Sequence, residues 1–141
     1  MCWDGKPLTF KNPSTGRIDR EFAVKAFHRP AAGLEQALPS DVRPPHILKS
    51  TLDYLIESII GGKHSLEAVH SFVRDRTRSI RQDFTLQNNR GDEAINAHER
   101  IARFHILCLH QLCLSKDFSV QQEMEQLRKG IVYSINNSYD L

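Results

Sequence analysis

Four arginines fall within eight positions, at Arg74, Arg76, Arg78 and Arg81. Guanidinium groups bind carboxylates and phosphates through paired hydrogen bonds, so such a cluster indicates either an ion-pair network or a surface for an acidic partner. On a helix, Arg74, Arg78 and Arg81 share one face, whereas Arg76 lies about 160° from Arg78. We expect a chiefly structural cluster, and we keep Arg74, Arg78 and Arg81 as candidates for binding nucleic acid or a partner.

Three charged residues are candidates for structural ion pairs. Arg76 and Asp83 are seven residues apart, which is two turns along one helix face. Glu99, on the next predicted helix, is their expected partner across the interface. Because removing one member of a buried pair leaves an uncompensated charge, we expect Arg76→Ala to destabilise the fold by about 3–5 kcal/mol in the fully buried limit.

Histidine and cysteine could supply metal ligands near residue 100. His98 begins a segment like a zinc-protease helix, but Ala102 stands where the second histidine is required. His105 and Cys108 are three residues apart and could face one metal, yet no partner pair is evident on another element. We therefore expect buried thiols and histidines at the rim of a core, with no metal, cofactor or catalytic residue.

Four helices must position these residues. The spacing of apolar residues predicts helices over about 45–60, 65–87 and 92–114, and a fourth from 119 onward. All six prolines lie at or before Pro45, so residues 1–44 are expected to form an extended arm and residues 45–141 a helical array. The sequence therefore predicts an all-α fold, either an antiparallel bundle or the start of an α-solenoid.

The last predicted helix carries an apolar stripe. Its members are Met124, Leu127, Ile131 and Ile135, three and four residues apart. An α-helical array normally ends in a helix with a polar outer face, which this helix lacks. We expect Leu127, Ile131 and Ile135 to form an interface, either with a second copy or with a continuation of the array.

Composition narrows the class of protein. A chain of 141 residues with 40% hydrophobic and 26% charged residues can bury a core, which excludes a wholly disordered or collagen-like polymer. The longest apolar run is four residues, and the N-terminus shows no secretory signal pattern. The three cysteines are an odd number and lack the regular spacing of a disulfide-bonded fold, which is typical of a protein from a reducing compartment. A net charge of +2 does not by itself indicate a nucleic-acid-binding protein.

Several segments together are similar to one known family. FVRDRTRSIRQDFTLQ at 72–87 and HERIARFHI at 98–106 resemble the GANP-type family of messenger-RNA export scaffolds, whose yeast member is a suppressor of actin mutations. The resemblance covers residues 18–141. Its flanking blocks occur in the family's order: AFHRPAAG at 26–33, LPSDVRPPHILKSTLDYLI at 38–56 and GIVYSINNSYD at 130–140.

The resemblance implies a tetratricopeptide-like array of which this chain is the N-terminal part, ending before the family's winged-helix module. It implies a non-enzymatic scaffold of the nuclear transcription-export complex, supporting messenger-RNA export at the nuclear pore. The implied partners are another winged-helix subunit and a small acidic proteasome-associated subunit, with RNA bound by the full assembly. The alternatives are a proteasome-lid-like assembly subunit and a stand-alone nucleic-acid-binding helical domain.

Overall fold

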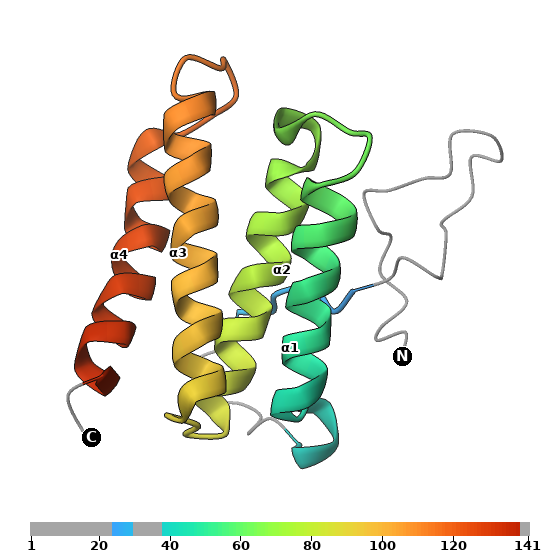
Figure 1. Ribbon diagram of the computed structural model, residues 1–141, viewed down its shortest axis with the longest axis vertical. Coiled ribbons are helices and arrows are strands. Elements are labelled where there is room, and N and C mark those ends of the chain that lie inside the picture. The colour runs from blue at the N-terminus through green and yellow to red at the C-terminus, as the bar shows by residue number, and fades with distance from the viewer. Residues whose placement is uncertain (1–23, 30–37, 139–141) are drawn as a thin grey trace, which may run out of the picture.

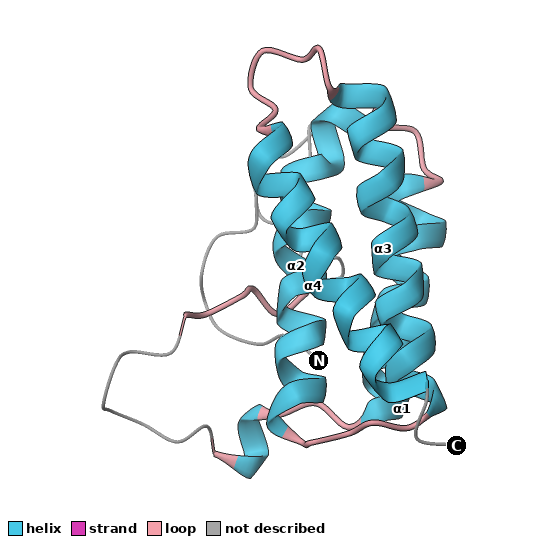
Figure 2. Cartoon of the chain, turned by 90° about the vertical axis from the view of Figure 1, so that its left-hand side faces the viewer, coloured by secondary structure: helices cyan, strands magenta, loops and turns pink. Residues whose placement is uncertain are grey.

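The computed structural model describes residues 24–29 and 38–138, and Figure 1 shows four α-helices side by side with α3 between α2 and α4. Every regular element of these described ranges is helical (Figure 2), which confirms the predicted all-α class. No helix within them is both long and apolar enough to cross a membrane. The elements are η2 (Pro39–Asp41), α1 (Pro45–Tyr54), η3 (Leu55–Ile60), α2 (Leu66–Leu86), α3 (Asp92–Leu112) and α4 (Val120–Ser138).

Short polar residues fix where the longer helices begin. The Ser65 hydroxyl accepts a hydrogen bond from the Ala68 amide at 3.3 Å, just before α2. Ser119 does the same for the Gln122 amide at 3.4 Å, just before α4. Each serine satisfies an amide that has no partner within the first turn of its helix. Both helix starts are therefore set by the local sequence and agree with the ranges that the apolar spacing predicts.

The first predicted helix changes character before it ends. Its second half, η3, is π-helical, and Gly61 and Gly62 follow it directly. A Cβ atom at Gly61 would lie 2.6 Å from the carbonyl oxygen of Glu57, and one at Gly62 would collide with the carbonyl oxygen of Ser58. The glycine pair therefore ends the helix for a steric reason, because only glycine allows the chain to pass this close to the π-helical turn.

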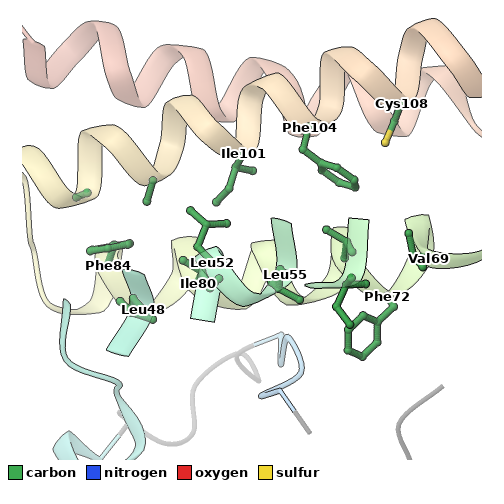
Figure 3. Packing of buried hydrophobic residues seen from close by; sticks show 14 of the residues in the cluster. Leu48, Leu52, Leu55, Val69, Phe72, Ile80, Phe84, Ile101, Phe104 and Cys108 are labelled. Carbon is green, nitrogen blue, oxygen red and sulfur yellow. The ribbon is translucent and has the colours of Figure 1, made fainter. Parts of the chain in front are cut away.

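One apolar cluster fills the space between α1, η3, α2 and α3. Figure 3 shows Ile101, Phe104 and Cys108 of α3 pointing towards α2. Among the described residues, α4 contributes no member to this cluster, although Tyr133 packs at its edge. The buried members are Leu48, Leu52, Leu55, Ile59, Val69, Phe72, Val73, Ile80, Phe84, Ala94, Ala97, Ile101, Phe104, Cys108 and Leu112.

Part of the predicted arm lies on α2. Residues 24–29 are extended and cross behind that helix in Figure 1. The Phe27 amide donates to Asp75 Oδ2 at 3.1 Å, and Gln82 Nε2 donates to the His28 carbonyl at 2.9 Å. This segment of the arm is therefore bonded to the helical array, and the rest of residues 1–37 lies outside the described ranges.

Candidate functional site

The last helix turns its polar face inward. Glu123 and Gln126 are only 1% and 4% exposed. Gly130 continues the same face, and a Cβ atom there would lie 3.5 Å from the His98 carbonyl of α3. These three positions recur at three and four residues, so they form one stripe along the helix. Helix α4 therefore packs on α3 through hydrogen-bonding and small residues.

Long side chains join this inward face to α2 and α3. We call the resulting group the polar seam. At its centre, Glu123 Oε1 lies 2.6 Å from His105 Nδ1, and Oε2 lies 3.0 Å from His70 Nε2 and 3.3 Å from Arg74 Nε. A carboxylate can only accept hydrogen bonds, so both imidazoles donate an N–H to it. The polar seam consists of His70, Arg74, Arg81, His105, Glu123 and Gln126.

The electrostatics of the polar seam make Glu123 an anion beside neutral His105. Burial raises the pKa of Glu123, but hydrogen bonds from His105 and His70 outweigh it and lower that pKa to about 2. Burial lowers the pKa of His105, although its hydrogen bond to Glu123 acts in the other direction. His105 is therefore neutral near pH 7, and Arg74 provides the charge that balances the carboxylate.

Arg81 closes the next turn of the polar seam. Its guanidinium donates to the Gln126 carbonyl at 3.1 Å and to Gln126 Oε1 at 2.5 Å. Burial, with repulsion from Arg78 and Arg74, lowers the pKa of Arg81 to about 10. The side chain therefore stays charged at neutral pH, and its attachment to α4 is a charge-assisted hydrogen-bond pair.

A second buried carboxylate, Asp83, binds the N-terminal arm. Asp83 is fully buried, and its oxygens accept hydrogen bonds from Lys25 Nζ at 2.8 Å and Arg43 Nε at 2.7 Å. The Arg43 amide donates to it as well, at 3.2 Å, while Arg43 Nη2 donates to Ser79 Oγ at 2.9 Å. Two cations that are 18 residues apart in the sequence thus converge on one carboxylate of α2.

The arginine cluster is directed into the fold. The polar seam holds Arg74 and Arg81, and Arg81 is only 8% exposed. Arg78 lies over the Phe27 ring of the arm, with 4.0 Å between the guanidinium carbon and the ring centroid. The three candidate nucleic-acid-binding arginines therefore bind other parts of this chain and form no continuous exposed patch within the described residues.

The three ion-pair candidates all form ion pairs, but the predicted pairing with Glu99 is wrong. Arg76 is buried and pairs with the adjacent Asp75. Glu99 is exposed and lies 3.4 Å from Arg103, one turn along α3. Asp83 is neutralised by the arm. Helix spacing correctly puts Arg76 and Asp83 on one face of α2. It does not show that Arg76 pairs with its neighbour Asp75, or that Asp83 pairs with the arm.

The apolar face of α4 points to solvent. Ile131 and Ile135, at 40% and 50% exposed, are uncovered as predicted, whereas Leu127 is half-buried. Val120 and Met124, which are 44% and 51% exposed, extend this face towards the start of the helix. We call Val120, Met124, Leu127, Ile131 and Ile135 the α4 stripe. Its role as an interface stays a prediction.

An aromatic contact fixes the second half of α4. The ring of His98 stacks on Tyr133 with centroids 3.6 Å apart and planes 9° apart, while His98 Nδ1 donates to the Ala94 carbonyl at 2.8 Å. The Tyr133 hydroxyl donates to the Asn89 carbonyl before α3. Burial lowers the pKa of His98 to about 4, so a neutral imidazole occupies this position.

Sequence reasoning missed the residues that complete both carboxylate sites. Lys25 and Arg43 lie in a proline-rich region without periodicity, so no spacing pattern connects them to Asp83. Glu123 recurs with Gln126 and Gly130 on a helix face next to the α4 stripe, but polar residues on such a face ordinarily indicate the solvent side. The sequence argues against a metal at His105 and Cys108 because no partner pair is evident, but it does not show that His70 and Glu123 lie beside Cys108.

The chain is thus an all-α helical module whose last helix packs inward through polar contacts and exposes apolar side chains on its free side. Residues 6–141 match the model of the SAC3/GANP family, and the chain belongs to that family. This confirms the resemblance found in its sequence.

Three relatives illustrate the membership. The chain is 68% identical over 129 residues to SAC3 family protein 1 of Schizosaccharomyces pombe, which is 92% of this chain and 13% of that protein. It is 31% identical over 125 residues to SAC3 family protein B of Arabidopsis thaliana, covering 82% and 7% of the two chains. It is 36% identical over 102 residues to protein xmas of Drosophila melanogaster, covering 67% and 5%. The chain therefore spans a small part of each relative.

Proposed function

We propose that this chain is a non-enzymatic scaffold segment of a nuclear transcription-export complex, which supports messenger-RNA export at the nuclear pore. Membership of the SAC3/GANP family supports this process, because that family is linked to messenger-RNA export complexes. In the full-length protein, the partners implied by the resemblance are a winged-helix subunit and a small acidic proteasome-associated subunit.

The α4 stripe is the observation that carries the scaffold role. Helix α4 lies at the edge of the array (Figure 1), and the apolar cluster is complete without it. The polar seam holds Glu123 and Gln126 inward, so α4 cannot rotate to bury Ile131 and Ile135 without breaking buried charge-assisted hydrogen bonds. Contiguous apolar surface that is fixed outward is typical of a protein–protein interface.

The polar residues favour a scaffold over the other candidate functions. Both Glu123 oxygens accept hydrogen bonds within the fold, so this carboxylate is already engaged and is not presented for acid–base catalysis. Arg74 and Arg81 bind α4, which leaves them unsuited to phosphate contacts. These contacts favour an architectural role over an enzyme or a stand-alone nucleic-acid-binding domain.

A segment exchange in fission yeast tests the proposal. The chain replaces the matching 129-residue segment of SAC3 family protein 1, and a strain that lacks this segment serves as the reference. We expect the exchanged protein to locate at the nuclear rim and to keep polyadenylated RNA cytoplasmic, whereas the deletion should retain that RNA in the nucleus. Normal RNA distribution in the deletion strain, with the truncated protein present, would contradict the proposal.

A further inference from the structure

Three helices bring potential metal ligands together beneath the surface. His70 Nε2 of α2, Cys108 Sγ of α3 and a carboxylate oxygen of Glu123 of α4 all lie within 4.8 Å of one another. Cys108 and Glu123 are at most 1% exposed, and the side chain of His70 is 17% exposed. A nitrogen, a sulfur and an oxygen donor thus meet where only the histidine reaches towards water.

We propose that His70, Cys108 and Glu123 form a zinc site that joins α2, α3 and α4. Imidazole nitrogen, thiolate and carboxylate are the three ligand types that zinc uses in proteins, with bonds of about 2.0–2.3 Å. Tetrahedral geometry then requires separations of about 3.3–3.6 Å between ligand atoms. Small side-chain movements bring the three donor atoms to these separations, and water on the open side of His70 supplies the fourth ligand.

Charge balance makes the exchange of metal for arginine possible. Without metal, Arg74 neutralises Glu123, from which it lies 3.3 Å, and Cys108 keeps its proton. Binding of Zn²⁺ displaces the Arg74 guanidinium, whose side chain is 21% exposed and can turn to solvent. The Cys108 thiol loses its proton to water, and neutral His70 carries its proton on Nδ1 in place of Nε2, which frees Nε2 to bind the ion. Zn²⁺, one thiolate and one carboxylate then again sum to zero. The buried site is therefore neutral in both states.

His105 supports the site without being a ligand. Its Nδ1–H donates to the Glu123 oxygen at 2.6 Å, and the ring is fully buried. A hydrogen bond of this kind orients a ligating carboxylate and strengthens its binding of the metal, as outer-shell hydrogen bonds to metal ligands do. It leaves the other Glu123 oxygen, which contacts His70, to face the metal.

Cobalt titration of the purified chain tests this site. Co²⁺ substitutes for Zn²⁺ and gives a thiolate-to-metal charge-transfer absorption only when cysteine is a ligand. We expect one equivalent to bind with that absorption, and Zn²⁺ to displace it. The absorption should persist when Cys2 and Cys113 are both changed to Ser, which leaves Cys108 as the sole thiol. It should vanish in Cys108→Ala, whose folding is checked by circular dichroism.

A second pair of variants keeps the test decisive if Cys108→Ala does not fold. His70→Ala removes a half-buried ligand and should weaken Co²⁺ binding by about 100-fold or more. Arg74→Ala removes the competing cation and should strengthen binding, which a purely structural ion pair would not do. No charge-transfer absorption in the folded wild-type chain, or its loss in the Cys2→Ser, Cys113→Ser variant, would overturn the zinc site. Weaker binding in Arg74→Ala would do the same.

Discussion

At the scale of single residues, two buried carboxylates determine how segments of this chain are joined. Asp83 binds the arm through Lys25 and Arg43, and Glu123 binds α2 and α3 to the last helix. A buried charge is tolerated only when other charges and hydrogen bonds compensate it. Each carboxylate therefore specifies which segments must lie beside it.

Changing Asp83 to Asn tests the first of these sites. The substitution keeps the shape of the side chain but leaves Lys25 and Arg43 without a counter-charge in a buried place, so the free energy of unfolding should fall by about 3–5 kcal/mol. Urea unfolding at neutral pH measures it. Glu99→Gln is the matched control, because it breaks an exposed pair on α3 and should change stability by no more than about 0.5 kcal/mol. Equal effects of the two variants would contradict the role of Asp83.

His98 should make the fold sensitive to mild acid. Burial lowers its pKa from 6.5 to about 4. Between these two values the imidazole is therefore protonated in the unfolded chain but neutral in the folded chain. Its contribution is fully present above pH 6.5 and is lost as the pH falls towards 4, with a total of about 3 kcal/mol. In His98→Phe this part of the pH dependence should disappear, as followed by urea unfolding across that range. His110→Gln, at an exposed position of α3, should keep the wild-type profile.

At the scale of elements, the sequence predicts well where the helices lie along the chain, but it predicts poorly which side chains of other helices they contact. Apolar spacing and the caps at Ser65 and Ser119 place the helices nearly as the structure has them, because these signals are local. The π-helical form of η3 is not predicted, since apolar spacing over six residues does not distinguish a π-helical turn from an α-helical one. The inward polar face of α4 was missed too, because its partners come from other helices.

The orientation of α4 leads to a prediction about association. Changing Leu127 and Ile131 to Ser should weaken self-association of the chain, because both belong to the α4 stripe, while the free energy of unfolding changes little. Sedimentation velocity over a range of concentrations measures this. Val132→Ser is the control, because Val132 is 48% exposed but lies outside the stripe. A wild-type chain that stays monomeric at high concentration would contradict association through this face.

At the scale of the whole molecule, the arm and the helical array depend on each other. The contrast between proline-rich residues 1–44 and the helical remainder indicates two parts, yet Lys25 and Phe27 are bonded to α2. The sequence predicts an extended arm but not the surface on which it lies, because irregular segments carry no periodic signal. The contact with Asp83 answers that question for residues 24–29.

Removing residues 1–37 should raise the helix content per residue while lowering the free energy of unfolding. The shortened chain keeps all four α-helices, so its circular dichroism should show more helix per residue than the full chain. Its free energy of unfolding should nevertheless be lower by about 1–3 kcal/mol, because Asp83 loses the charged hydrogen bond from Lys25. Lys25→Ala in the full chain should reproduce most of this loss. Undiminished stability of the shortened chain would show that the arm contact contributes nothing.

The proposed scaffold role depends on the α4 stripe being the surface through which this segment contacts its complex. The most direct measurement is the nuclear fraction of polyadenylated RNA in fission yeast carrying the exchanged segment, with Leu127 and Ile131 changed to Lys. We predict nuclear retention that approaches that of the segment deletion, while Val132→Lys resembles the unaltered exchange. Normal export with both stripe residues changed, and with the protein at its usual abundance, would contradict the proposed scaffold role.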